Sequence, residues 1–502
     1  MTNRSRVLLI LIGSVLAARL GLSALLPFMD TTEPRYAEIA RIMAETGDWI
    51  TPWFDYGVPF WGKPPLSFWA EALSFRLFGV SEFAGRLPSW LATVGTVVLV
   101  YVLTQKLDTD LSDKQKHIRG LWAALIFSTM ALTFLSAGTV MTDAYLTLGT
   151  TLALVGFILR LQGYSILWGW ALFAGLAIGL LAKGPISLVL TGLPILAWLQ
   201  AVRRWRETWR RLPWLTGTLT LTAVVLPWYV VAEMKTPGFL DYFLIGEHFK
   251  RFVISDWQGD LYGNAHDFTR GTIWLYLVLG SFPWGFLLLA GVVKRFRQSI
   301  GRENSPSAGI GDGLFVIAAT LAPAFFFTLS GNILWTYILP GLPFLAVLVV
   351  TYCPVHEPGP TARRAFLAAC LVPFVGVGAS IWLNLNSSGL KTEKYLIQRY
   401  EEQTHHPMES LRYLNEAPFS ARYYSKGRVQ TITWNQLTAQ LDEPPPRADT
   451  FLAVRKGNQD AIRALRRHFP VIDSNRRYLL FSMKKSSSLS DAALLRDLRS
   501  AG

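Results

Sequence analysis

Acidic and basic side chains that suit proton transfer and anion binding gather in one polar segment, residues 29–87. It holds Asp30, Glu33 and Arg35 within six positions, and Lys63 stands later in PFWGKPPLSFW. Carboxylates can move protons, whereas guanidinium and ammonium groups can hold negative charge. The segment directly follows an apolar run of about twenty residues, long enough to cross a membrane. Because ionisable residues beside a membrane are costly and usually functional, this segment is a candidate site.

Five later segments bring groups of the same kinds, each beside an apolar run. They are Asp143 in MTDAYLT, Lys183 in LLAKGPIS, the trio Glu247, His248 and Arg251 in GEHFKRF, His266 in GNAHDF, and Tyr337 in WTYILPG. Each group alone also fits an ordinary structural role. The acids suit helix caps, the lysines can snorkel to headgroups, and the histidines and tyrosine suit the membrane interface. Their shared side of the membrane is the stronger argument for a common site.

The apolar runs predict a polytopic all-α membrane protein with about eleven transmembrane helices. The candidate spans are residues 7–28, 88–105, 119–138, 144–161, 165–182, 185–201, 213–232, 271–293, 313–330, 333–352 and 365–383. Five short segments rich in Lys and Arg then fall on one side, which the positive-inside rule makes cytoplasmic. We therefore attribute the net charge of +14 to basic residues that orient the spans and lie beside anionic lipid. Nucleic acid is not expected as a partner.

The opposite side receives the long first loop, residues 29–87, and a polar tail, residues 384–502. The tail alternates apolar strands with an amphipathic helix, which predicts a small soluble α/β domain after a membrane domain of residues 1–383. In the first loop, PRYAEIARIMAE predicts an amphipathic helix. Its charged face, with Glu38, Arg41 and Glu45, is expected to be solvated.

The first loop also carries a recognisable pattern, E-x-R-Y-A-E-I-A-R-x-M-x-x-x-G-D-W-x-x-P followed by G-V-P-F-x-x-K-P-P-L-x-x-W. It resembles the lipid-linked-sugar glycosyltransferases of the GT-C fold, nearest to the bacterial aminoarabinose (4-amino-4-deoxy-L-arabinose) lipid A transferases and related to the protein O-mannosyltransferases. The segments TDAYLT, LAKGPISL, EHFKRF, SFPW and TYILPGLP follow in the family's order. Two positions depart from the pattern, Thr32 and Gly62, where the family usually has acids.

This resemblance implies roles for the candidate residues. Arg35, Lys63 and Tyr337 match the family's phosphate-binding positions, with support from Lys183, His248 and Arg251. Glu33, Asp30 and Asp143 are the candidates for the base that accepts the proton of the incoming hydroxyl. The donor phosphate is already an activated leaving group, so no nucleotide is required and no cofactor is certain. A divalent metal at Glu247, His248 or His266 stays an open alternative, although these three residues fall short of a ligand set.

The implied function is an inverting hexosyl- or pentosyltransferase that moves a sugar from a polyprenyl phosphate to lipid A, another envelope glycan or a protein. The implied place is a bacterial inner membrane, with the site and the tail in the periplasm. The alternative is a transporter or flippase, since charges near span ends also mark ion paths. A transporter is expected to show inverted repeats, and we detect none in this sequence. A transporter also has no evident need for the long first loop and the long tail.

Overall fold

The computed structural model describes residues 2–107, 111–254, 257–263, 268–299, 310–357, 359–442 and 450–484. The chain forms two compact units. Unit 1 contains Met1–Ala24, Met43–Trp53 and Gly57–Ala379, and unit 2 contains Leu25–Ile42, Phe54–Tyr56 and Ser380–Gly502. The predicted domain boundary at residues 383 and 384 stays a prediction, because unit 2 also includes two pieces of the first loop.

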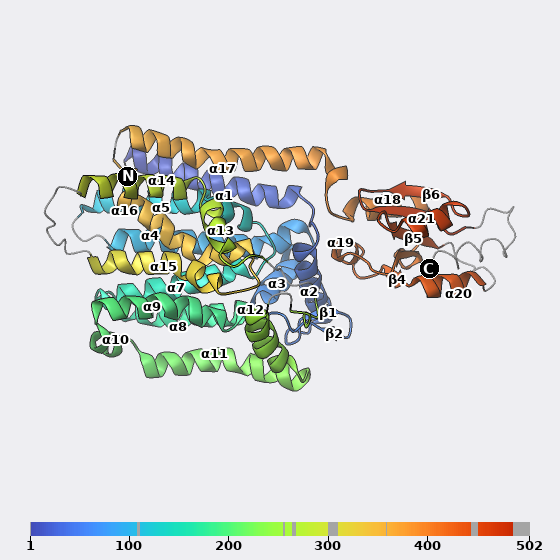
Figure 1. Cartoon of the computed structure of the whole chain (residues 1–502), viewed down its shortest axis with the longest axis horizontal. Coiled ribbons are helices and arrows are strands. Elements are labelled where there is room, and N and C mark those ends of the chain that lie inside the picture. Colours follow the sequence, from blue (N-terminus) through green and yellow to red (C-terminus); the bar gives the residue numbers. More distant parts are fainter. Residues whose placement is uncertain are drawn as a thin grey trace. The chain divides into compact units, whose positions relative to one another are not determined.

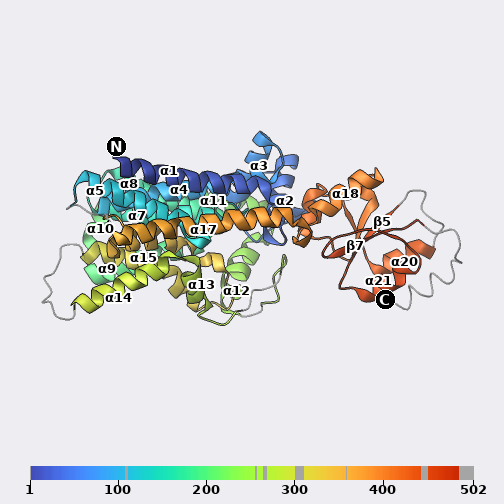
Figure 2. The same ribbon diagram turned by 90° about the horizontal axis from the view of Figure 1, so that it is seen from above.

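Long helices that run side by side form most of unit 1 (Figures 1 and 2). The helices of the first half of the chain, short ones included, are α1 (Asn3–Leu25), α2 (Thr32–Thr46), α3 (Leu66–Phe78), α4 (Glu82–Leu107), α5 (Asp113–Thr129), α6 (Ala131–Ser136), α7 (Asp143–Leu161), α8 (Ile166–Lys183), α9 (Ile186–Val202), α10 (Trp205–Arg211) and α11 (Trp214–Lys235). The residues of α2 up to Ile42 belong to unit 2. The π-helix η1 (Asp241–Lys250) and α12 (Arg251–Val253) follow, and then α13 (Thr272–Gly280), α14 (Trp284–Ser299), α15 (Ile310–Thr328), η2 (Trp335–Gly341), α16 (Leu342–Tyr352) and α17 (Pro360–Leu385).

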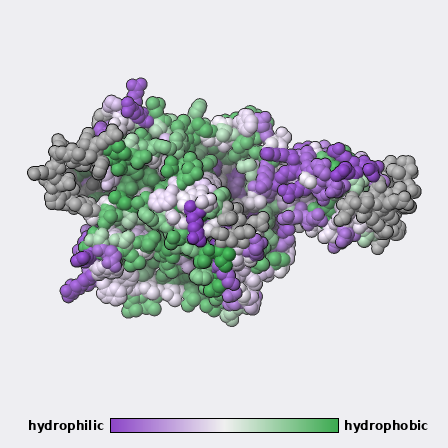
Figure 3. All heavy atoms as spheres, in the orientation of Figure 1, coloured by the Kyte–Doolittle hydropathy of each residue, from purple (hydrophilic) through white to green (hydrophobic). Residues whose placement is uncertain are grey.

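The polytopic fold predicted from the apolar runs is confirmed. Among the described residues, eight helical segments are long and apolar enough to cross a membrane. The predicted span 271–293 is instead a broken pair, because α13 and α14 meet at 97°. The predicted spans 119–138 and 185–201 fall on α5 and α9, which have 17 residues each. Figure 3 shows that apolar residues cover much of the visible surface of unit 1, as expected for a face that meets lipid.

Glycines allow α7 and α8 to pack backbone against backbone. A Cβ atom added at Gly149 would lie 2.7 Å from the carbonyl oxygen of Gly175, and one added at Gly156 would lie 2.6 Å from the carbonyl oxygen of Trp168. Small residues are what lets membrane helices approach this closely. The two helices form a hairpin, so the first residue of α7, Asp143, comes beside the end of α8.

Unit 2 is built on a mixed five-stranded sheet in the order β4-β3-β5-β7-β6. Its strands are β3 (Leu411–Leu414), β4 (Gln430–Ile432), β5 (Phe451–Arg455), β6 (Val471–Ser474) and β7 (Tyr478–Ser482). Strands β4, β3 and β5 are parallel, whereas β7 runs antiparallel to both β5 and β6. Around the sheet lie α18 (Lys394–Thr404), α19 (Phe419–Tyr424), α20 (Trp434–Asp442) and α21 (Gln459–Arg466). The predicted C-terminal α/β fold is confirmed.

The two faces of this sheet bury separate apolar clusters, so the sheet is a central layer. One cluster contains Leu452 and Val454 of β5 with Ile462 and Leu465 of α21. The other contains Phe451 and Ala453 of β5 with residues of α18. This alternation along β5 is the two-residue period of a strand covered on both faces.

The expectation that the charged face of α2 is solvated is wrong for two of its three residues. Glu38 and Arg41 are 3% and 5% exposed, and two hydrogen bonds of 2.7 and 2.8 Å join them. Gly427 of the tail lies against them, since a Cβ added there would be 3.3 Å from Glu38 and 3.2 Å from Arg41. Only Glu45 is exposed. The helical period was visible in the sequence, but the tail that covers its polar face lies almost 400 residues away.

Candidate active site

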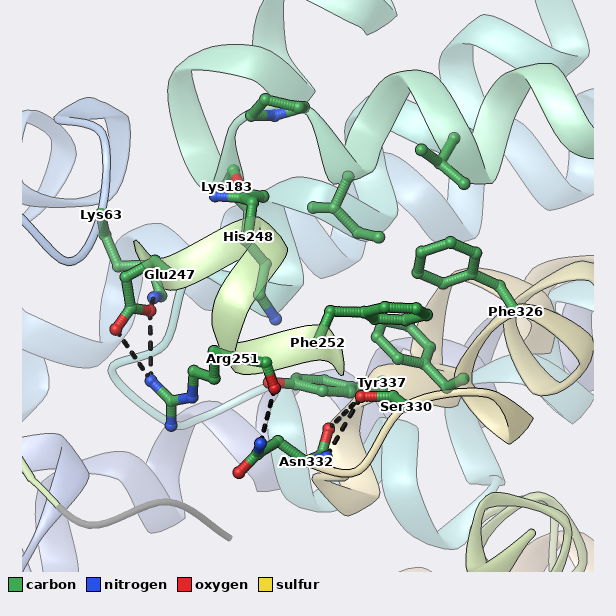
Figure 4. Close-up of a pocket in the computed structure, with 14 residues that line it drawn as sticks. Lys63, Lys183, Glu247, His248, Arg251, Phe252, Phe326, Ser330, Asn332 and Tyr337 are labelled. Carbon is green, nitrogen blue, oxygen red and sulfur yellow. Dashed lines mark hydrogen bonds and ion pairs between the residues drawn. The ribbon is translucent and has the colours of Figure 1, made fainter. Parts of the chain in front are cut away.

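A pocket of about 180 Å³ in unit 1 gathers most of the residues that the sequence singled out (Figure 4). Its polar lining consists of Lys63, Lys183, Glu247, His248, Arg251, Ser330, Asn332 and Tyr337, and its apolar lining of Pro185, Ile186, Val189, Phe252, Phe326 and Phe327. The pocket therefore has groups for a charged head and a surface for a hydrocarbon chain. An amphiphilic ligand fits that combination.

Glu247 holds two cations at the polar end of the pocket. Its carboxylate lies 3.1 Å from Nζ of Lys63 and 3.0 Å from Nη1 of Arg251. Burial alone raises the pKa of Glu247, but the charges of Lys63 and Arg251 outweigh burial and lower the pKa to about 2. Glu247 is therefore ionised at any physiological pH. It fixes both cations in place.

Arg251 keeps a donor for a ligand although it is paired with acids. Besides Glu247 it contacts Asp260, at 3.3 Å. Its Nε atom is nevertheless buried without a hydrogen-bond partner among the described residues. A buried guanidinium donor without a partner is costly, and an oxygen atom of a bound anion would satisfy it.

A second ion pair lies at the neighbouring wall, where the α7–α8 hairpin ends. Nζ of Lys183 is 2.6 Å from Asp143 and 4.5 Å from the centroid of the Tyr337 ring. Gly184 follows with a φ of +78°, and a Cβ there would lie 2.5 Å from Phe243 of η1. Glycine is thus required both for the positive φ and for the approach of η1. The turn brings Lys183 to the pocket.

His248 connects η1 to this turn. Its Nδ1 lies 2.8 Å from the carbonyl oxygen of Phe243, and its Nε2 lies 3.2 Å from that of Lys183. Burial lowers the pKa of His248 and so favours the neutral ring, which can donate only one of these two hydrogen bonds. Both ring nitrogens face backbone oxygens, and this arrangement suits a support for the pocket wall.

Two lining groups escaped the sequence analysis, Ser330 and Asn332. Nδ2 of Asn332 donates to the carbonyl oxygen of Arg251 at 2.6 Å, and the Ser330 hydroxyl donates to the Asn332 carbonyl oxygen at 2.9 Å. They hold the chain around Arg251. The polar triplet S-G-N between two apolar runs was a signal for them. The spacing of Glu247 and Arg251, four residues apart, was likewise a signal for their ion pair.

Three predicted site residues lie in unit 2 and outside this pocket: Asp30, Glu33 and Arg35. The Arg35 guanidinium lies over the rings of Tyr36 and Phe419, at 5.1 and 5.6 Å. Asp30 accepts hydrogen bonds from both the backbone and the hydroxyl of Ser420. These contacts suit an anchor better than a base.

The open question of a metal site concerns Glu247, His248 and His266. His266 lies outside the described residues. Within the described part of the chain, no three His, Cys, Asp or Glu residues are grouped in a way that could hold a metal ion. Glu247 instead binds two cations, and His248 binds backbone oxygens.

Comparisons with known proteins point in one direction. The family model of dolichyl-phosphate-mannose-protein mannosyltransferases matches residues 15–243. An undecaprenyl phosphate-α-4-amino-4-deoxy-L-arabinose arabinosyl transferase of Pseudomonas savastanoi is 30% identical over 393 residues, which cover 76% of this chain and 69% of the relative. The chain belongs to the aminoarabinose transferase family. A further relative, from Aeromonas hydrophila, is 31% identical over 64% of this chain and 55% of its own length.

A solved structure of an aminoarabinose transferase family member has the same fold. ArnT from Cupriavidus metallidurans, crystallised with undecaprenyl phosphate, superposes with a TM-score of 0.73 at 17% identity and covers 96% of this chain. At that identity the likeness establishes the GT-C fold alone. The alignments with the relatives from Aeromonas hydrophila and Erwinia tasmaniensis span 55% and 54% of those proteins.

Proposed function

We propose that this member of the aminoarabinose transferase family transfers a sugar from a polyprenyl phosphate to an acceptor hydroxyl. The observation that carries the proposal is the pocket in which Lys63, Lys183, Arg251 and Tyr337 converge beside an apolar wall. A polyprenyl phosphate has the matching chemistry, with an anionic head and an isoprenoid chain. The relatives are named for undecaprenyl phosphate and aminoarabinose, which supports a donor of this class.

The phosphate is proposed to sit against the orphaned Nε of Arg251. Lys63 and Lys183 add point charges, and the Tyr337 hydroxyl adds one neutral donor. Glu247 and Asp143 hold the cations in place before the donor arrives, and such preorganised charge is what stabilises a leaving group. Phe252, Phe326 and Val189 offer the isoprenoid chain its apolar contacts.

The reaction is proposed to be a single displacement. The acceptor oxygen attacks the anomeric carbon, the bond from that carbon to the phosphate oxygen breaks, and polyprenyl phosphate departs with the electron pair. The proton of the acceptor passes to a carboxylate. Attack from the face opposite the leaving group inverts the anomeric centre.

Of the three acids predicted as candidates for that base, Asp143 and Glu33 are preferred to Asp30, whose carboxylate is bound by Ser420 and Arg477. Asp143 is paired with Lys183, a residue of the pocket lining, which favours it. Glu33 stays a candidate base because it matches an acid of the family's first-loop pattern, although Thr32 stands where the family has a second acid. Arg35 stays a predicted phosphate ligand because it matches the same first-loop pattern. Transfer is to be measured with Glu33→Gln and Asp143→Asn proteins that still bind undecaprenyl phosphate. The variant that loses its transfer activity identifies the base.

The proposed location is a bacterial inner membrane, with the pocket and unit 2 on the periplasmic side. The support is the distribution of Lys and Arg, which accumulate at the other ends of the spans. Lipid A, another envelope glycan and a protein hydroxyl are the acceptor classes that the family allows. Mass spectrometry of lipids and proteins from cells with and without the chain identifies the acceptor.

The test compares two lysines that each form an ion pair. Lys63 pairs with Glu247 inside the pocket, whereas Lys235 pairs with Asp48 and is far more exposed. We expect Lys63→Gln to weaken binding of undecaprenyl phosphate and to lower transfer at least about 100-fold, the usual cost of removing one charge-stabilising donor. Lys235→Gln is the control and should retain both. Equal behaviour of the two variants would exclude the proposed phosphate site.

The same assay separates the proposal from a flippase. A transferase cleaves the sugar from its carrier when an acceptor is present. A flippase moves the intact lipid between leaflets and leaves the bond whole. Release of free undecaprenyl phosphate by purified protein in detergent, where no leaflets exist, therefore supports transfer, and its absence with every acceptor class contradicts it.

A further inference from the structure

A buried ionic cluster in unit 2 links the first loop to the C-terminal sheet. Nη2 of Arg477 lies 2.6 Å from Asp30 and 2.7 Å from Glu393. The two carboxylates are 2% and 0% exposed, and the arginine is 16% exposed. One guanidinium thus faces two acids from distant parts of the chain. Buried charges are stable only when they are paired in this way.

Asp30 has further partners in the tail. Its two carboxylate oxygens accept hydrogen bonds from the backbone N–H of Ser420 at 2.8 Å and from the Ser420 hydroxyl at 2.5 Å. Its own N–H donates to the carbonyl oxygen of Lys391 at 2.9 Å. Two residues earlier, the N–H of Phe28 donates to the Tyr424 hydroxyl at 2.7 Å. The segment before α2 is therefore held through both main chain and side chain.

The same tail segment reaches the first turn of α2. Phe419, next to Ser420, lies under the guanidinium of Arg35. α2 begins at Thr32, two residues after Asp30, and carries Glu33 and Arg35. The position of the helix start thus depends on contacts that Asp30 makes with residues of the tail.

The charge on Glu393 varies near neutral pH. Burial raises its pKa to about 7, against the lowering effect of Arg477 and with a contribution from the nearby Asp30. The other polar groups that face it are Tyr413 of β3, Tyr478 of β7, Asn475 before β7, and Ser420 of α19, whose hydroxyl oxygen accepts from the Glu393 N–H. Among these neighbours, Arg477 is the cation, and two ionised carboxylates leave the cluster with an excess negative charge.

We propose that Asp30 is a positioning residue, and that its clamp by Ser420 and Arg477, modulated by protonation of Glu393, sets the first turn of α2 for sugar transfer. This inference rests on the proposed function through Glu33 and Arg35. At low pH Glu393 is neutral and Arg477 serves Asp30 alone. As pH rises through the pKa of Glu393, a second buried anion competes for Arg477 and the clamp loosens.

The sign follows from proton linkage. The pKa of Glu393 is higher in the folded protein than the ordinary value of 4.5. Its contribution to stability is therefore complete below that ordinary value and declines as pH rises toward the folded pKa. The clamp is expected to be tighter at pH 6 than at pH 8.

The first experiment follows amide hydrogen exchange of residues 28–36 in the full-length protein, because exchange reports the clamp without any turnover. Asp30→Asn and Ser420→Ala should each exchange about tenfold faster, the effect of losing one charge-assisted hydrogen bond. Asp460→Asn, which alters the exposed Arg463–Asp460 pair, is the matched control and should leave exchange unchanged. Unchanged exchange in both clamp variants overturns the proposal.

The second experiment measures transfer against pH. Wild-type kcat is expected to fall between pH 6 and 8, and Glu393→Gln, which stays neutral, should remove that fall. Ser420→Ala should lower kcat several-fold with little change in the KM for the donor. If instead Asp30→Asn abolishes transfer while Ser420→Ala and hydrogen exchange stay at wild-type values, Asp30 is a base and the clamp is excluded. If wild-type protein transfers nothing while exchange behaves as expected, the proposed function fails and the clamp stands.

Discussion

The buried carboxylates of Glu247 and Glu393 each face an arginine, yet their pKa values move in opposite directions. In unit 1, Glu247 lies between Lys63 and Arg251, which lower its pKa to about 2 against the effect of burial. In unit 2, Glu393 shares Arg477 with a second acid, and burial raises its pKa to about 7. Burial raises the pKa of both glutamates, so the ratio of cations to carboxylates around each one decides the direction of its net pKa shift. One cluster holds a fixed charge and the other a variable one.

Removing the shared cation of the second cluster should have the largest effect. Arg477→Gln leaves Asp30 and Glu393 buried without their counterion, and breaking such a pair costs about 3–5 kcal/mol. We expect thermal unfolding of unit 2 at a clearly lower temperature, followed by intrinsic tryptophan fluorescence and by protease cleavage in the tail. Arg463→Gln, in an exposed pair with Asp460, is the control and should change stability by less than about 1 kcal/mol. A similar stability for both variants would contradict the contrast between the clusters.

Removing a cation from the first cluster should affect function more than stability. Arg251→Gln retains a hydrogen-bonding side chain but leaves Glu247 with Lys63 alone and removes the orphaned Nε. We expect kcat/KM for the polyprenyl donor to fall about 100- to 1,000-fold, the usual loss on removing one donor to developing charge. Steady-state transfer and binding of undecaprenyl phosphate measure it. Wild-type affinity for undecaprenyl phosphate in this variant would argue against Arg251 as a phosphate ligand.

Neutralising the acid with the raised pKa should have a smaller, pH-dependent effect. Between pH 5.5 and 8, ionisation of Glu393 is expected to reduce the stability of unit 2 by about 2 kcal/mol, because the folded state holds the proton more tightly than the unfolded state. Glu393→Gln should flatten this pH dependence. Chemical denaturation at several pH values, with Glu409→Gln as the control for a more exposed acid, measures the difference.

The sequence could predict the parts of the fold that depend on local pattern. The apolar runs predicted the helices. The polar segments beside these runs predicted that Lys63, Lys183, Arg251 and Tyr337 share one side of the membrane, and the structure has all four in one pocket. The bend between α13 and α14 was not predicted, because an uninterrupted apolar composition hides a change of direction. The motif SFPW, with Pro283 at the break, was its only local signal.

Contacts between distant segments were the part that local patterns could not supply. Glu38 and Arg41 have the spacing of a solvated helix face, yet residues of the tail bury them. Asp30 is a candidate base from the sequence because it is an acid near Glu33, and only the structure shows its contacts with Ser420 and Arg477. Both cases depend on pairings across about 390 to 450 residues, and a single sequence contains no signal for such pairings.

The glycine contacts between α7 and α8 have a consequence for how the protein tolerates substitutions on its lipid-facing surface. Main-chain atoms, and not mobile side chains, set the separation of these two helices at Gly149 and Gly156. The placement of Asp143 beside Lys183 therefore depends on this main-chain contact more than on lipid-facing side chains. Sequence change can accumulate on lipid-facing positions without altering this ion pair, provided that the seam between the two helices keeps its smallest residues.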